Sequence, residues 1–521
     1  MDNFIPMPPH TDVAAVSPQT TVILASGIEW GNDYEHVRYY ENGKAGCLAH
    51  VKEKAIHTFM QSAPVRWGEL TYKGKGNESD FLKCNYIAFQ NKPYTEEWYF
   101  GFVTRVEWLS DGSFKIYFEP DRFQNSFYDV VLQPCYVERE HVAKADDAVG
   151  ANLVPENLET GEYIVNTSAG MGFGLMNYCL IASADENGVA LEPELNQKIM
   201  SGLTYFSTTD FDTIKQKIQA YSKSGNADAI VSIFQAPNLC FSESPKDFSM
   251  IFPSTLAGYT PKNKKLFQYP FSYLIADAHD GTQYVFRLEY FKDQKITFTA
   301  QGVKLNIPSI YIYPKNYKHE LTANTPYAFT YSNFPTCAWT NDAYQAWLAQ
   351  SQPIWDYQTK QQYIDTGKSV VSTIANVLSG NFGKAIESSI GQTVSNFMFG
   401  ENISAQMEQH DLIPPTAKGS ATGSYVQTAL FSNTIALKTM CVTPEMAKVI
   451  DDYFTMYGYA THRIKVPNIT GRTNWNFVKT VNCGLHGTCV TDDINFLQSM
   501  FNKGVTFWHT DDVGNYGLSN D

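Results

Sequence analysis

The sequence predicts a mainly β fold with some α-helices, an α+β architecture. Three observations lead to this prediction. Runs that alternate between apolar and polar residues meet at Asp-Gly pairs, which is typical of β-hairpins. Charged residues make up only 18% of the chain, below the roughly 25% of an ordinary soluble domain. Aromatic residues make up 14% of the 521 residues, so several large cores can form.

Two hairpins are the clearest elements. The first lies in EWYFGFVTRVEWLSDGSFKIYFEP, residues 97–120, and turns at Asp111-Gly112. The second lies in residues 271–291 and turns at His279-Asp280-Gly281, and residues 295–314 continue the strands. Period two places the apolar residues of the first strand on one face: Trp98, Phe100, Phe102, Val106 and Trp108.

Three helices are predicted among these strands. The first begins after a capping residue, Asp210, and ends at Gly225. The second is capped by Thr443 and stops at Gly458. Its predicted buried stripe consists of Met446, Val449, Ile450, Tyr453 and Tyr457. The third is predicted to be capped by Thr491, to direct Ile494, Leu497 and Phe501 inward, and to end at Gly504.

Charge and cysteine usage limit the possible partners. The net charge is −14, whereas stable binding to a nucleic acid backbone needs basic side chains. The densest basic run, Lys262-Asn263-Lys264-Lys265, is interpreted as a solvated loop. An acidic surface is still compatible with DNA that passes without adhering. The nine cysteines follow no paired spacing, which predicts reduced thiols and synthesis in a cytoplasm.

Neither a signal peptide nor a constitutive membrane span is expected. The first twenty residues, MDNFIPMPPHTDVAAVSPQT, lack a basic region followed by an apolar one. Their prolines predict an extended arm. No run of about 18 apolar residues occurs in the chain.

The sequence contains no complete catalytic or metal-binding motif, so we predict no catalytic residue, metal or cofactor. Residues 365–369, DTGKS, resemble the end of a phosphate loop but lack its first glycine. Cys483, His486 and Cys489 have the spacing C-x2-H-x2-C without an assigned fourth ligand, so free thiols are favoured over zinc. His509, close to two acids, is interpreted as a structural histidine.

The segment 369–400, SVVSTIANVLSGNFGKAIESSIGQTVSNFMFG, carries only two charges, Lys384 and Glu387. Apolar residues recur four apart, which is helical spacing: Ile374, Leu378, Phe382, Ile386, Ile390, Val394 and Met398. Two helices are expected, near 368–379 and 384–398. Their other faces carry Ser, Thr, Asn and Gln, which cost less to bring into a membrane than charges do. The residues alone leave two alternatives open, a membrane-active element or a hairpin packed in a core or subunit interface.

The C-terminal quarter contains long and unusual strings. Tyr457-Gly458-Tyr459 closes a helix, residues 504–511 read GVTFWHTD, and Gly514-Asn515-Tyr516 follows. In these strings the chain resembles the tail knob, or distal tail tube, proteins of small short-tailed bacteriophages (podoviruses). The resemblance continues through WGNDYEHVRYY, both hairpins, VEREHV at 137–142 and the IPP at 413–415. It reaches from about residue 22 to the end and is weaker at 143–265 and 330–400.

The resemblance implies tail-tube or hub-like β-barrel domains that close into a six-fold ring. Such a homohexamer forms a hollow knob at the tail tip of the virion, contacts an upstream tail or collar protein, and carries DNA outward during ejection. A hydrophobic loop ahead of the Pro-Pro element plugs the lumen and is released into the host cell membrane. In this chain the loop corresponds to 369–400.

We therefore expect specific residues to act in this loop. The membrane-active side chains are Val370, Val371, Ile374, Val377, Leu378, Phe382, Ile386, Ile390, Val394, Phe397, Met398 and Phe399. The expected hinges or breaks are Gly367, Gly380, Gly383, Gly400, Pro414 and Pro415.

The sequence patterns and this resemblance together predict how the chain is divided into segments. The predicted organisation comprises an arm (1–20), a first tube part (21–142), a peripheral α/β region (143–265), a second tube part (266–335), an insertion with the loop (336–412) and a C-terminal tube segment with two helices (413–521).

Two other classes compete with this interpretation. One is a structural or receptor-binding tail protein whose apolar hairpin only packs subunits together. The other is a cell-wall-degrading tail enzyme, which would need placed carboxylates or a zinc site.

Overall fold

The computed structural model describes residues 19–318, 327–338, 420–422 and 434–521, except 63, 66, 67, 93, 94, 183, 190–194, 197, 198, 201–203, 227, 228, 243, 280, 304–308, 333 and 335. The chain divides into two compact units. Unit 1 combines three stretches of sequence, 1–159, 261–266 and 445–521. Unit 2 contains residues 160–260 and 267–444.

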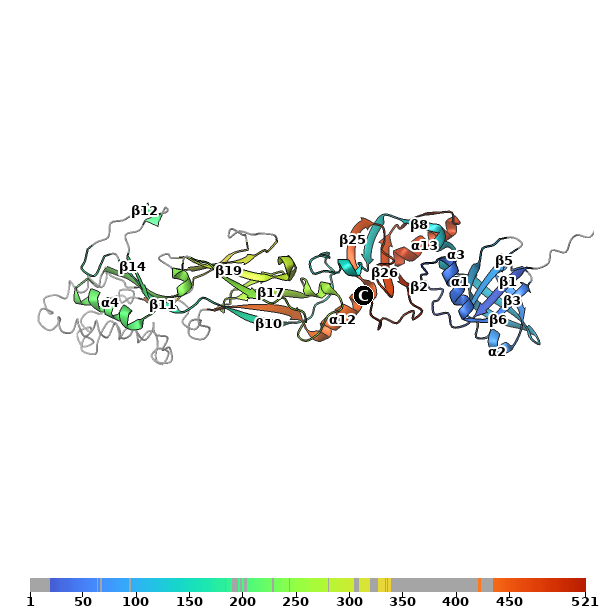
Figure 1. Cartoon of the computed structure of the whole chain (residues 1–521), viewed down its shortest axis with the longest axis horizontal. Coiled ribbons are helices and arrows are strands. Elements are labelled where there is room, and N and C mark those ends of the chain that lie inside the picture. The colour runs from blue at the N-terminus through green and yellow to red at the C-terminus, as the bar shows by residue number, and fades with distance from the viewer. Residues whose placement is uncertain are drawn as a thin grey trace, which may run out of the picture. The chain divides into compact units, whose positions relative to one another are not determined.

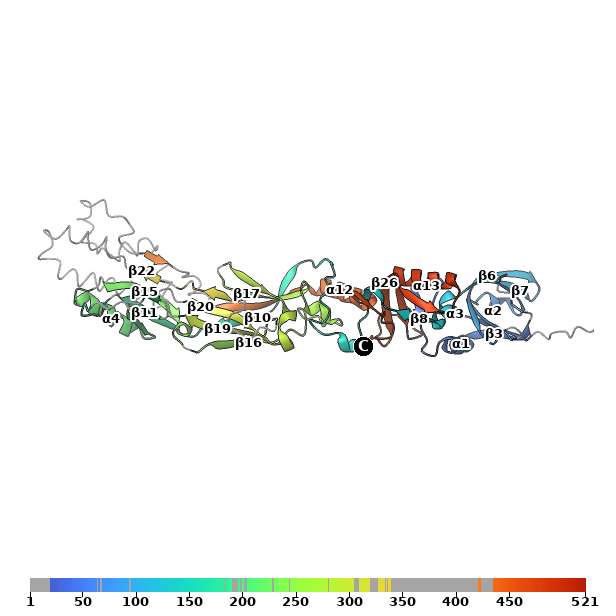
Figure 2. The same ribbon diagram turned by 90° about the horizontal axis from the view of Figure 1, so that it is seen from above.

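The first sheet of unit 1 has six antiparallel strands in the order β3-β1-β5-β6-β7-β4. Their bounds are β1 Thr20–Ala25, β3 Ala55–Ser62, β4 Thr71–Lys75, β5 Tyr86–Asn91, β6 Tyr99–Ser110 and β7 Ser113–Pro120. The sheet curls, so that β6 and β7 lie on one side and β3 on the other, with the short helix α2 (Glu78–Phe81) between them (Figure 2).

Both faces of this sheet are buried. Along β1, Val22 and Leu24 belong to the core inside the curl, whereas Ile23 belongs to the core on the outer face. Cys47 and Val51 of α1 (Lys44–Glu53) pack into that second core. Central strands buried on both faces read as continuous apolar runs, and TTVILA in β1 fits this rule.

The first predicted hairpin is confirmed, because β6 and β7 are joined at residues 111 and 112. The prediction of a single apolar face on β6 is wrong. A β-bulge between Val103 and Arg105 shifts the register, so Phe100 and Phe102 pack in the outer core while Val106 packs inside the curl. A bulge adds one unpaired residue and reverses the alternation that follows it.

The second sheet of unit 1 has the order β2-β28-β26-β9-β25. Its strands are β2 His36–Arg38, β9 Cys135–Glu140, β25 Tyr459–Lys465, β26 Trp475–Val481 and β28 Val505–Trp508, and β8 Val130–Gln133 pairs with β27 Gly484–Gly487 beside it. Helices α13 (Thr491–Lys503) and α3 (Arg122–Ser126) cover one core, and α13 lies against β26 (Figure 1). Leu497 and Phe501 point inward as predicted, and Ile494 is half-buried.

Two predictions about these helices are corrected. Val490, not Thr491, is the N-cap of α13, and no side chain caps it. The helix α12 (Pro444–Tyr457) buries Ala447, Ile450, Asp451, Phe454 and Thr455, so its buried face is rotated from the predicted stripe and Val449 is exposed. The rotation follows from Asp451 and Thr455, which face inward because both accept hydrogen bonds from the buried Asn263.

Unit 2 contains two four-stranded sheets over a shared core. The first has the order β10-β24-β17-β18 and the second β16-β19-β20-β21. Their bounds are β10 Tyr163–Gly172, β24 Thr434–Val442, β17 Ser272–Asp277, β18 Gln283–Phe286, β16 Lys246–Met250, β19 Ile296–Val303, β20 Ser309–Lys315 and β21 Phe329–Tyr331. The β17–β18 pair confirms the second predicted hairpin.

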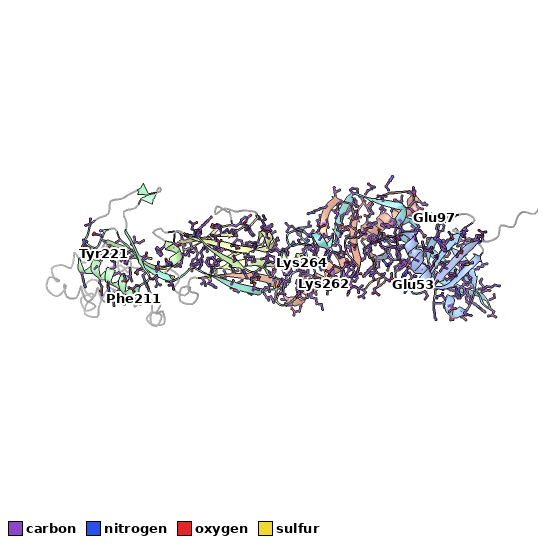
Figure 3. All side chains as sticks on the ribbon, viewed as in Figure 1. Glu53, Glu97, Phe211, Tyr221, Lys262 and Lys264 are labelled. Atoms are coloured by element: carbon purple, nitrogen blue, oxygen red, sulfur yellow. The ribbon has the colours of Figure 1, made fainter. Side chains whose placement is uncertain are left out.

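A further sheet of unit 2 has the order β14-β11-β15-β22-β23. Its strands are β11 Met176–Ala182, β14 Thr204–Thr208, β15 Ile230–Pro237, β22 Thr336–Ala338 and β23 Ser420–Thr422, and a short pair joins β12 Leu195–Asn196 to β13 Ile199–Met200. Helix α4 (Phe211–Lys223) packs against β11 and β14, with Phe211 and Tyr221 near its ends (Figure 3). Asp210 caps it as predicted, since its carboxylate accepts from the Thr213 amide at 2.9 Å.

Short 3-10 turns complete the described structure: η1 Phe127–Asp129, η2 Lys144–Asp146, η4 Asn238–Phe241, η5 Lys264–Phe267, η6 Leu288–Tyr290 and η7 Lys292–Gln294. Among the described residues, the helices are too short or too polar to cross a membrane.

Gly458, which ends α12, allows a close approach that no other residue would permit. Its φ is +64°, and an added Cβ would lie 2.2 Å from the carbonyl oxygen of Glu140. Gly112 has nearly the same φ of +66°, but a Cβ added there would lie 3.8 Å from the nearest atom, the carbonyl oxygen of Gly76. Gly458→Ala should lower the free energy of unfolding by about 3 kcal/mol or more, from backbone strain plus overpacking.

Gly112→Ala is the matched control, since it adds the backbone strain of about 1 kcal/mol without the clash. Urea denaturation of the full chain measures both variants. Equal losses for the two would contradict the close-approach explanation.

Candidate functional site

All predicted loop and hinge residues, from Gly367 to Pro415, lie outside the described residues, as does the phosphate-loop-like string 365–369. The structure does describe where this part of the chain leaves and rejoins the fold. Strand β22 ends at Ala338 and β23 begins at Ser420, and the two strands pair antiparallel with Cys337 opposite Ala421. β22 in turn pairs with β15, and β23 forms the sheet edge. Residues 339–419 are therefore an insertion between two neighbouring strands.

The polar site that the structure builds most fully lies in unit 1, around Glu156. The Glu156 side chain is buried and forms ion pairs with Arg139 on β9 and with Lys265. Its carboxylate also accepts from the backbone amide of Ala460 at 2.9 Å. Burial lowers the pKa of Lys265, and the Glu156 carboxylate opposes this shift. A buried charge is tolerated when it is both paired and hydrogen-bonded.

A second ion pair adjoins the first. Arg472 lies 3.3 Å from the Asp147 carboxylate, and both side chains are buried. Its Nε also donates to the carbonyl of Val142 at 2.7 Å. The Tyr459 hydroxyl donates to the other Asp147 oxygen at 2.8 Å. Residues 142–159 are thereby fastened to the later segment 459–472.

The run Lys262-Asn263-Lys264-Lys265 corrects one prediction, because it is not simply a solvated loop. Lys262 and Lys264 are exposed (Figure 3), but Asn263 and Lys265 alternate with them and are buried. The Asp451 carboxylate of α12 accepts from the amides of Lys262 and Asn263 at 2.7 and 3.0 Å. The Asn263 side chain also donates to Asp451 at 2.8 Å.

A cavity of about 270 Å³ adjoins this network within unit 1. Its walls come from His141, Lys144, Lys262, Asn263, Thr455, Arg472 and residues 517–521. His141 is buried and held in one tautomer, since Nδ1 accepts from the Phe477 amide at 2.7 Å and Nε2 donates to the Thr455 carbonyl at 3.1 Å. Lys144 pairs with Asp521. These groups already bond one another, so the arrangement serves to hold segments together.

The residues considered for metal or acid–base chemistry occupy different surroundings. Cys483 lies in a core beside Cys135, and burial raises its pKa to about 12. Cys489 donates to the Ser126 carbonyl at 3.2 Å. His509 is 3.2 Å from the Asn476 side-chain oxygen, and burial lowers its pKa. In the part of the chain that the structure describes, no group of three or more His, Cys, Asp or Glu could hold a metal.

Sequence reasoning missed Glu156, Asp451, Asn263 and Lys265. One signal was available: residues 261–265 read Pro-Lys-Asn-Lys-Lys just before LFQYPF, an apolar run. Polar residues directly before a buried apolar run can themselves be buried, as Asn263 and Lys265 are. The distance in sequence between Glu156, Lys265 and Ala460 hid the pairing.

Comparisons with known proteins now place the chain. Residues 236–521 match the family model described as Bacillus phage phi29 tail knob protein gp9, C-terminal domain. Residues 18–131, which contain the six-stranded sheet, match a second family model, described as the caudoviral major tail protein N-terminus. The class is thus a β-rich structural protein of phage tails. The chain belongs to the gp9 tail knob family and is a component of the virion tail.

Individual relatives agree over nearly the whole length. The tail knob protein gp9 of Bacillus phage B103 is 23% identical, with 96% of this chain and 98% of the relative covered. The gp9 of Bacillus phage phi29 is 22% identical with the same coverage. The solved tail knob protein gp12 of bacteriophage C1 matches with a TM-score of 0.65 at 14% identity, covering 94% of this chain and 97% of its own. That match shows the fold.

Glu156→Gln should destabilise the protein strongly. The substitution keeps the shape but leaves Arg139 and Lys265 with one buried anion fewer, which typically costs about 3–5 kcal/mol. Glu138→Gln is the matched control, because its pair with Lys479 is more than a third exposed and such pairs contribute about 0–1 kcal/mol. Urea denaturation measures both, and similar losses would refute the role of the Glu156 network.

His141 should make stability depend on pH. Burial, followed by the Arg472 charge, lowers its pKa to about 3 from the ordinary 6.5. Between these two pH values the unfolded chain binds a proton that the folded chain does not. Stability therefore falls as pH falls from 6.5 towards 3, by up to about 1.4 kcal/mol per pH unit.

His141→Gln keeps a neutral donor and acceptor and removes the titration. The slope of unfolding free energy between pH 6.5 and 4.5 should be shallower in the variant than in the wild type. Equal slopes would show that His141 does not contribute.

Proposed function

We propose that this chain assembles into a homohexameric ring that forms the hollow tail knob of a short-tailed phage. The ring is a conduit for DNA, and the insertion around 369–400 plugs its lumen and is released into the host cell membrane. The proposal assigns no catalytic role to the chain. The observation that carries it is family membership, together with the nearly uncharged segment 369–400, which the resemblance predicts to be the family's loop.

The anchoring of the insertion supports this proposal. Because β22 and β23 are neighbours, the chain leaves and rejoins the sheet at adjacent strands, so the order of the other strands does not depend on the insertion between them. β23 is a three-residue edge strand without charged side chains. Few backbone hydrogen bonds thus retain the far end of the insertion, and each contributes only about 1 kcal/mol.

The composition of the segment supports a membrane role over a purely structural one. Roughly a dozen large apolar side chains, each worth about 1.5–3 kcal/mol on burial, need a cover before release. Each expected helix, at about 12–15 residues, would reach roughly 18–22 Å, which is less than the roughly 30 Å of a bilayer core. The segment would therefore lie in the interface, merge into one helix or act as an oligomer.

The net charge of −14 supports passage of DNA without adhesion. A ring of acidic chains repels the phosphate backbone, so DNA in the lumen would not be retained by counterion release. The partners are then further copies of the chain, the upstream tail or collar protein and the host membrane.

A disulfide across the base of the insertion tests the role of release. Cys337 and Ala421 are direct partners across an antiparallel pair, and their Cα atoms are expected about 4.5–5.5 Å apart, within disulfide reach. Ala421→Cys, oxidised, should suppress dye leakage from liposomes that the full-length wild type causes at mildly acidic pH. Reduction should restore leakage.

The double variant Cys337→Ser with Ala421→Cys cannot form this bond and should leak like the wild type under oxidising conditions. If the wild type causes no leakage under any condition, the insertion only packs subunits together. If the oxidised variant leaks normally, release does not require separation of β22 from β23.

A further inference from the structure

Two cysteines meet in the core of the second sheet of unit 1. Cys135 is the first residue of β9, and Cys483 lies between β26 and β27. Both belong to the core that α13 covers, where Cys483 is fully buried and 7% of Cys135 is exposed. The Cys135 thiol is within hydrogen-bonding reach of the Cys483 thiol. Both thiols are free.

Strand pairing on both sides holds these two cysteines close together. Strand β26 pairs with β9 as far as Val481, and β27 pairs with β8 from Gly484 onward. Cys483 lies in the two-residue joint between these ladders on one side, and Cys135 lies in the joint on the other. Paired residues of antiparallel strands have Cα atoms about 4.5–5.5 Å apart, within the range of about 4.4–6.8 Å found in disulfides. A bond across the joint therefore needs little backbone movement.

The backbone at Asn482 directs Cys483 into the same core as Cys135. Val481 and Asn482 are both exposed and Cys483 is buried, whereas a regular strand alternates at every residue. The φ of Asn482 is +53°, in the left-handed region that asparagine tolerates better than most residues do. This break in the alternation places both thiols on one face.

The two thiols belong to distant stretches of the sequence. Cys135 lies in the stretch 1–159 of unit 1 and Cys483 in the stretch 445–521. A disulfide restricts the unfolded chain more strongly as the loop that it closes becomes longer. Thiols stay reduced in a cytoplasm, but disulfides persist on virions outside the cell, and this chain is a component of the virion tail.

We propose that Cys135 and Cys483 form a disulfide after the virion leaves the host cell, and that this bond joins the first and last stretches of unit 1. The oxidant is a low-molecular-weight disulfide. The Cys135 thiolate attacks one of its sulfur atoms and releases the other as a thiolate. The Cys483 thiolate then attacks the Cys135 sulfur of this mixed disulfide and displaces the second small thiolate.

The balance of this exchange is complete. The two cysteines lose two protons and two electrons in total, and the small disulfide takes up both to become two thiols. The bond requires neither the ring nor the release of the insertion, so it goes beyond the proposed function.

Burial makes the exchange slow. It raises the pKa of Cys483 to about 12, so little of the reactive thiolate is present. No residue of the neighbouring β8–β27 pair is fully buried, and local opening of this pair would expose both thiols. Disulfide formation that takes hours fits a bond that forms outside the cell and not during synthesis.

Oxidation of the purified full chain tests the bond. After incubation with oxidised glutathione, digestion without reduction should yield a linked peptide that contains Cys135 and Cys483. The unfolding temperature of unit 1 should rise by about 5 °C or more, because the closed loop is long. Dithiothreitol should reverse both changes.

Cys135→Ser cannot form the bond and should unfold at the same temperature with and without oxidised glutathione. Cys489→Ser is the matched control, since Cys489 is a half-buried thiol close by in the sequence, and this variant should keep the full rise. The linked peptide is measured on the wild type, so it decides the matter even if Cys135→Ser does not fold.

Three results would contradict the proposal. The Cys135 and Cys483 thiols could both remain free after oxidation, or the linked peptide could join either of them to Cys489 instead. A correct linked peptide without a rise in unfolding temperature would show that the bond does not hold the two stretches of unit 1 together.

Discussion

Burial of charge is the constraint on which the construction of unit 1 depends. The buried Glu156 carboxylate is paired with Arg139 and Lys265, and these three residues come from separate parts of the sequence. Asp451 requires the amides of Lys262 and Asn263 in the same way. These contacts join segments that are far apart in the sequence, and breaking one partner of a buried pair leaves an uncompensated charge.

The sheet elements were largely predictable because turn chemistry and alternation are local signals. Both Asp-Gly hairpins and the Asp210 cap follow from residues that are close in sequence. The failures have non-local causes. The bulge in β6 moves Val106 to the other face, and the hydrogen bonds to Asn263 turn Asp451 inward on α12. Neither the bulge nor these long-range hydrogen bonds can be recognised from the spacing of apolar residues in the sequence.

In the candidate site, too, local features could be predicted from the sequence and non-local ones could not. The apolar segment 369–400 is visible in sequence because its lack of charge is a local property, and its assignment as a functional loop stays a prediction from the resemblance. The β22–β23 base was not visible, since Thr336–Ala338 and Ser420–Thr422 are short and carry no hairpin signal. Short strands far apart in sequence are recognised only once the sheet is known.

The composition of unit 1 from three stretches of sequence also has a consequence for synthesis. Its second sheet takes β2 and β9 from the first 159 residues and β25, β26 and β28 from residues 445–521. On the ribosome, the early strands must wait while residues 160–444, most of which belong to unit 2, emerge, which takes tens of seconds at typical elongation rates. During this interval β9 lacks both of its partners. The chain thus depends on its last residues to complete the structure begun by its first, and late truncations leave sheet edges exposed to aggregation.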